Sequence, residues 1–139
     1  MYDLSTQAEA LVETLEMELT IGTVAYIDED SQSANYPATL PAAFVVMEKI
    51  AATGGSKKSG AADITWTVIV RGKKLNEADE SVLPVVDMVI DALVGLRPLK
   101  DVATPLQLLG VDYHDKQAES VAYAVRFLSK VKSNHYCTR

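Results

Sequence analysis

The chain has 139 residues, of which 48% are hydrophobic, and a formal net charge of −6 at pH 7. This length fits one compact domain, because two independent domains would each be too small to bury a sizeable core. The acidic balance argues against a broad phosphate-binding surface, since such a surface needs clustered Lys and Arg.

Cysteine content and hydropathy limit the cellular locations that the sequence predicts. The one cysteine, Cys137, excludes an intrachain disulfide and fits a reducing cytoplasm. The N-terminal segment lacks a basic start followed by an apolar run, so we expect no secretory signal peptide. Asp87, Asp91 and Arg126 interrupt the longest apolar stretches well short of the ~20 residues that a membrane span needs. We therefore expect a soluble protein with no membrane partner.

The first third of the chain predicts a helix, a short strand and a loop. Apolar residues recur at spacings of three and four over residues 5–19, with Asp3 or Ser5 placed to cap the start, as is typical of an amphipathic helix. Residues 23–28 are rich in β-formers and predict a short strand. Residues 28–40 lose the periodicity and carry polar residues and proline, which predicts an exposed connection.

Two strands joined by a loop are predicted next. Residues 42–49 contain the continuous apolar run FVVM, which is typical of a strand covered on both faces and placed centrally in a sheet. Residues 51–61 (AATGGSKKSGA) are rich in small residues and predict a mobile loop between paired strands. Apolar and polar residues alternate over residues 62–71, which predicts a strand with Trp66 on its buried face.

Residues 81–96 combine conflicting signals. Several β-branched residues and Pro84 oppose a helix interior. The apolar side chains nevertheless share one helical face, at positions 82, 85, 86, 89, 93 and 96. Because proline is tolerated in a first turn, we predict a helix that ends at Gly95 and Pro98.

A hairpin is predicted to complete the fold. Residues 104–113 predict a strand, residues 114–117 a polar turn and residues 121–128 a second, alternating strand. The whole pattern predicts a single α+β domain over residues 1–132, with a mostly antiparallel sheet of about five strands covered by an N-terminal helix and a central apolar helix. Residues 133–139 predict a polar tail.

No set of residues in the sequence forms a recognisable catalytic or cofactor site. In residues 51–61, Lys57 rather than glycine precedes Lys58 and a strand follows, so the stretch does not match a phosphate-binding loop. Asp87 and Asp91 lie one helical turn apart and could share a cation, but an exposed helix face explains them as well. We expect no catalytic residue, no cofactor and no metal.

The histidines and the aromatic residues also form no recognisable site. His114 and His135 lack a partnered nucleophile, so we expect no catalytic triad. Trp66 and Tyr123 could stack a ligand, but their place on alternating apolar faces favours a role in the core. The remaining candidate surfaces are the two edges of the predicted sheet, which native proteins cover, disrupt or use for binding.

Five segments carry a resemblance to a known family: YDLSTQAEALVETLE, LPAAFVV, ITWTVIVRG, SVLPVVDMVIDALVGL and LGVDYHDKQAESVAYAVRFLSKV. In their order and spacing the chain resembles the tail-terminator proteins of Mu-like phages, and the order of elements also resembles the terminator of phage lambda. The resemblance spans residues 2–132 and rests on order and spacing, because the family has no invariant chemical motif.

The resemblance implies a virion structural protein rather than an enzyme. Such a subunit forms a hexameric ring that caps the phage tail tube, stops its polymerisation and offers its other face to a neck or head-completion protein. It would be assembled in the bacterial cytoplasm and lie at the neck-proximal end of the tail. Genomic DNA would pass through the ring without sequence-specific binding, which an acidic lumen favours. Lys57 and Lys58 are then candidate contacts with an acidic partner or the DNA path.

The sequence leaves two other interpretations open. A tail-completion or head-closure subunit shares the small size, the ring and the lack of chemistry. A small ligand-binding or enzymatic α+β domain would instead place Trp66, Tyr123 and the pair Asp87 and Asp91 around one pocket.

Overall fold

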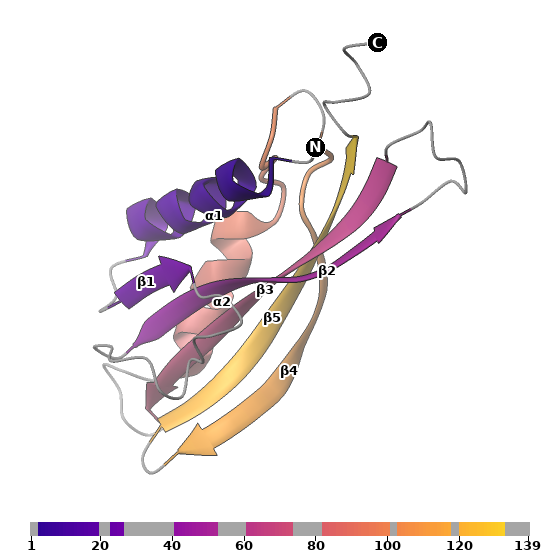
Figure 1. Ribbon diagram of the computed structural model, residues 1–139. Coiled ribbons are helices and arrows are strands. Elements are labelled where there is room, and N and C mark those ends of the chain that lie inside the picture. The colour runs from indigo at the N-terminus through magenta and orange to yellow at the C-terminus, as the bar shows by residue number, and fades with distance from the viewer. Residues whose placement is uncertain are drawn as a thin grey trace.

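The computed structural model describes residues 3–19, 23–26, 41–52, 61–73, 82–100, 103–117 and 120–132. Within these ranges lie the helices α1 (Leu4–Glu18) and α2 (Val82–Leu93) and the strands β1 (Thr23–Tyr26), β2 (Ala42–Ala52), β3 (Ala61–Lys73), β4 (Gln107–Gln117) and β5 (Ser120–Lys132). Both helices pack on the same face of one sheet (Figure 1). The predicted α+β class is therefore confirmed.

The five strands form one sheet in the order β1-β2-β3-β5-β4. β1 runs parallel to β2, whereas the other three pairs are antiparallel. β3 lies at the centre, and β2 is the interior strand next to it. β2 is fully buried only over its first four residues, so the prediction of a central strand covered on both faces holds for that half alone.

The amphipathic pattern at the N-terminus forms α1 as predicted. The helix buries Gln7, Ala8, Leu11 and Leu15 against the sheet. The predicted side-chain cap is wrong, because Asp3 occupies the N-cap position in a left-handed conformation (φ 53°) and its side chain makes no capping hydrogen bond. Ser5 lies inside the helix, beyond the capping position.

α2 forms despite its β-branched residues, because burial outweighs intrinsic propensity. Its buried residues are Val82, Val85, Val86, Val89 and Leu93, which are five of the six positions that the sequence places on one face. The sixth, Leu96, lies beyond the helix and is partly buried against the core. The helix ends at Leu93, next to the predicted end signal Gly95, which adopts a positive φ of 89°. The Gly95 amide donates a hydrogen bond to the Leu106 carbonyl (3.0 Å), so the end of α2 is tied to the segment that precedes β4.

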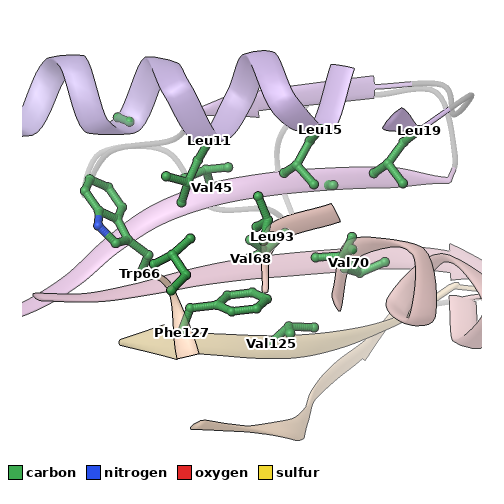
Figure 2. Close-up of a cluster of buried hydrophobic side chains, with 14 of the residues drawn as sticks. Leu11, Leu15, Leu19, Val45, Trp66, Val68, Val70, Leu93, Val125 and Phe127 are labelled. Carbon is green, nitrogen blue, oxygen red and sulfur yellow. The ribbon is translucent and has the colours of Figure 1, made fainter. Parts of the chain in front are cut away.

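The core lies between the helices and the sheet (Figure 2). Trp66, Val68 and Val70 of β3 point toward the helices, as the period-two pattern predicts. Phe127 of β5 and Leu11 of α1 are also fully buried in this cluster. A second, smaller cluster on the other face contains Ala42, Phe44, Ile69 and Ala122.

The predicted hairpin is correct in its pairing but wrong in its turn. Residues 114–117 continue β4 as far as Gln117, which pairs with Ser120 at the start of β5. Polar residues suit an outer strand, because their side chains reach solvent while the backbone completes its ladder with β5. Arg71 of β3 also pairs with Asp115 and draws this polar stretch into the sheet.

The packing of α1 predicts the cost of removing one of its buried side chains. Leu11 is fully buried, whereas Met17 on the same helix is 83% exposed. Leu11→Ala should lower the free energy of unfolding by about 2–5 kcal/mol because it leaves a cavity. Urea unfolding followed by Trp66 fluorescence measures the change. Met17→Ala is the matched control and should change stability by less than ~0.5 kcal/mol; equal costs for the two variants would contradict the packing of α1.

Candidate functional site

The structure tests only part of the sequence-predicted site. Lys57 and Lys58 lie outside the described residues, as do His135 and the predicted loop at residues 28–40. Asp87 and Asp91 are exposed on the outer side of α2. Asp91 borders a shallow hollow of about 290 Å³, which Glu18, Met88 and Ala92 also line.

The described side chains do not assemble the ligand pocket that the sequence left open. Trp66 is fully buried in the core, opposite Phe127, whereas Tyr123 pairs with Val70 farther along β3. Tyr123 instead makes an edge-on ring contact with Tyr113 of β4, with centroids 6.1 Å apart. Within the described ranges, no group of three or more His, Cys, Asp or Glu side chains is placed to hold a metal ion.

The outer strand β4 carries a row of exposed apolar side chains, which we call the β4 row: Leu108, Leu109, Val111 and Tyr113. Leu109 is 53% exposed and Tyr113 60% exposed. β4 is eleven residues long and forms one edge of the sheet. Native proteins usually keep edge strands short, charged or covered, because an exposed edge is a template for pairing with another chain. A long apolar edge is therefore a candidate interface.

The position of the helices explains why the β4 row is exposed. Leu108, Val111 and Tyr113 pair with residues of β5 whose side chains face the helices. They therefore lie on the helix side of the sheet. α1 packs mainly on β1 and β2, and α2 on β3 and β5. The helix-side residues of β4 are therefore not covered by α2, which buries the β5 residues that they pair with.

The other face of β4 holds its carboxylates in ion pairs. Arg126 of β5 reaches Asp112 through Nη1 and donates from Nε to Glu48 of β2 (3.0 Å). Arg71 donates from Nη2 to Asp115 (2.5 Å). The two arginines therefore neutralise both aspartates of β4 on the side away from the helices.

Arg71 is the most buried charge among these groups. The residue is only 5% exposed, and its Nη1 donates to the Ser120 hydroxyl (3.1 Å). Its Nε has no hydrogen-bond partner among the residues that the structure describes. A buried guanidinium depends on its carboxylate, because an uncompensated charge in this position carries a large desolvation cost. Asp115 therefore fixes the end of β4 to the centre of the sheet.

Glu48 is held in its charged form by its neighbours. The Thr67 hydroxyl donates to its carboxylate (2.5 Å) and is the largest cause of a lowered Glu48 pKa. The hydrogen bond and positive charge of Arg126 lower this pKa further, while partial burial opposes them. Glu48 occupies the irregularity in β2 between Met47 and Lys49. Its side chain there contacts Thr67 and Arg126.

A groove of about 490 Å³ lies beside α1 near the opposite edge of the sheet. We call it the α1 groove. Its apolar lining comes from α1, β1 and β2: Leu4, Ala8, Val12, Tyr26 and Met47. Three carboxylates on α1, Glu9, Glu13 and Glu16, also line it, together with Ser5. An apolar floor beside several carboxylates suits a segment with apolar and cationic side chains.

Comparison with known proteins adds no assignment. No protein-family model matches the chain, and no curated protein sequence matches it significantly. Among the described residues, neither helix is long and apolar enough to cross a membrane.

Sequence reasoning identified sheet edges as candidate surfaces without the residues that form them. The available signal was the apolar pair Leu108 and Leu109 followed by Val111 and Tyr113. Their exposure depends on the strand order, which places β4 at the edge. The α1 groove left no comparable local signal, because its lining comes from three separate elements.

The buried ion pair predicts a loss of stability when its carboxylate is removed. Asp115→Asn should lower the free energy of unfolding by about 2 kcal/mol, below the ~3–5 kcal/mol typical of a fully buried pair, because the Asp115 side chain is partly exposed. A double-mutant cycle with Arg71→Met isolates the coupling. Additive effects of the two substitutions would show that the pair does not anchor β4.

The lowered Glu48 pKa predicts an acid-dependent contribution to stability. A lowered folded pKa adds stability that is present above the unfolded value of ~4.3 and is lost as the pH falls through the folded value. Glu48→Gln should therefore flatten the decline in the free energy of unfolding below about pH 4. Urea unfolding at several pH values measures this decline. Glu16→Gln is the control, and an identical change in both variants would contradict a specific effect of Glu48.

Proposed function

We propose that this chain is a structural subunit of a phage tail, which forms a ring on the tail tube, ends tube polymerisation and provides the attachment surface for the neck or head. The observation that carries the proposal is the β4 row, an exposed apolar strip on an eleven-residue edge strand. Exposed apolar strips of this kind mark interaction sites. The resemblance in element order to tail terminators supplies the tail as the context.

The two sheet edges support assembly into a closed ring. One edge is β4, and the other is the four-residue β1 beside the longer β2. Contacts between unlike surfaces repeat head to tail, and they form a ring when the rotation closes. A hexamer is the ring size that the resemblance implies. The net charge of −6 suits a ring through which DNA passes without sticking.

A tail-completion or head-closure subunit is the second candidate function. The β4 row supports it equally, because such a subunit also assembles through its edges. The two candidates differ in what they bind first. A terminator binds the end of a tail tube, whereas a head-closure subunit binds a filled head.

The deciding experiment measures attachment to purified phage particles. Headless tails and tail-less heads from the phage or prophage that encodes the chain are incubated separately with the purified protein and imaged by electron microscopy. We expect a ring of density at one end of the tails. Attachment to heads alone favours the second candidate, and attachment to neither contradicts both.

The β4 row predicts how assembly responds to substitution. Val111→Asp should abolish the ring and reduce tail capping at least ~10-fold, because it places a charge in an apolar contact. Light scattering over a concentration series and counts of capped tails measure both effects.

Val94→Asp is the matched control, because Val94 is 48% exposed in the turn that follows α2, whereas Val111 is 38% exposed on β4. The control should assemble as the unmodified chain does. Normal assembly of Val111→Asp would contradict the proposal that the β4 row joins subunits.

A further inference from the structure

We propose that β4 of one copy of this chain adds to the outer side of β2 in the next copy, with Leu108, Val111 and Tyr113 of the β4 row lying in the α1 groove. The inference rests on the proposed ring and names the contact that builds it. The occupant of the groove is therefore a second copy of the same chain.

Among the described strands, none pairs with the outer side of β2 beyond the point where β1 ends, and we call this stretch the open side of β2. β1 pairs only with the first four residues of β2, and its last residue, Tyr26, pairs with Val45. β2 continues to Ala52, and beyond Val45 no described strand covers its outer side (Figure 1). Seven residues of β2 thus follow the last pair with β1. A strand from another chain can add to such an edge through backbone hydrogen bonds.

The α1 groove lies at the same place. Tyr26, the last residue of β1, and Met47, just past the last β1 pair, both line it. Leu4, Ala8 and Val12 of α1 line it as well. A strand added next to β2 would therefore place its helix-side residues beside α1, in an apolar environment.

The β4 row has the side chains that this position needs. Leu108, Val111 and Tyr113 share the helix side of the sheet, because the irregularity at Leu109 keeps them in phase with β5. Each is exposed in the single subunit. They would become buried in the α1 groove of the next copy.

Charge complementarity points to the same pairing. Asp112 and Asp115 of β4 already pair with Arg126 and Arg71 on the side away from the helices. Lys116 is exposed and pairs with Val121, which packs on the helix side. The helix side of β4 therefore presents a cation together with its apolar row. The α1 groove presents three carboxylates, Glu9, Glu13 and Glu16.

A symmetric contact between two β4 strands uses these features less well. It would bring two copies of Lys116 into one interface and leave the α1 groove empty. It would also stop at a dimer, because an isologous contact uses the same surface on both partners. When two subunits join through β4 and the α1 groove, one β4 row and one α1 groove remain free. Further subunits can therefore add until the ring closes.

The test mixes two variants that each lack one half of the contact. Val111→Asp disables the β4 row that one copy contributes to the contact. Tyr26→Asp places a charge in the α1 groove that receives it. Tyr26 is 45% exposed, so its substitution spares the core, and Leu83→Asp at a 40% exposed position is the matched control. Thermal melts followed by circular dichroism establish that each variant is folded. Light scattering then measures the mass of each variant and of their equimolar mixture.

Each variant alone should be a monomer, and the mixture should contain a complex of twice the monomer mass, because one intact half remains on each partner. Leu83→Asp should assemble as the unmodified chain does. Assembly of Tyr26→Asp alone into a dimer or ring would overturn the inference. A mixture that stays monomeric under conditions where the unmodified chain forms rings would also overturn it and would leave the proposed function standing.

If the free protein is a monomer and rings form only on tails, a charge reversal tests the same contact. Lys116→Glu should reduce the fraction of capped tails by about threefold, as expected for an exposed ion pair. Adding Glu13→Lys, in the middle of the three carboxylates, should restore capping. If the double variant caps fewer tails than Lys116→Glu alone, the proposed contact is overturned. Absence of capping by the unmodified chain would contradict the ring itself.

Discussion

The placement of both helices on one face of the sheet is the constraint on which the other features depend. Burial of apolar surface is the dominant favourable term in folding, and here it comes from the layer between α1, α2 and strands β1, β2, β3 and β5. β4 completes the backbone ladder of β5 but lies beyond the main helix cover. The β4 edge of the sheet therefore remains apolar and exposed, while α1 and its groove lie at the opposite edge.

Electrostatics organise the opposite face of the sheet. Arg126 links β5 to Glu48 on β2 and to Asp112 on β4, so its contacts span four strands of the sheet order. Arg71 connects the central strand to Asp115 near the end of β4. Replacing a buried ion pair by apolar residues is often neutral for stability, whereas removing one partner is strongly destabilising. The structural result of these ion pairs is a division of β4 into a neutralised charged side and an apolar side with Lys116.

This division bears on the proposed assembly. A subunit that joins others head to tail needs two unlike surfaces that do not satisfy each other within one chain. The β4 row and the α1 groove lie at different edges of the same sheet, so one subunit cannot close the contact on itself. Both surfaces belong to regular elements, and sites built on such elements are held more precisely than sites on loops.

Local residue patterns suffice to predict those elements whose hydrophobic period reports a buried face. Alternation over residues 62–71 fixed β3, and the helical spacing over residues 81–96 fixed α2 in spite of Pro84. Tertiary structure alone decided that residues 114–117 extend β4 instead of forming a turn, because pairing with β5 and the Arg71 ion pair outweigh local turn preference. It also decided which strand became an edge and where the α1 groove formed. Those outcomes depend on strand order and on contacts between distant segments, which a local residue pattern does not encode.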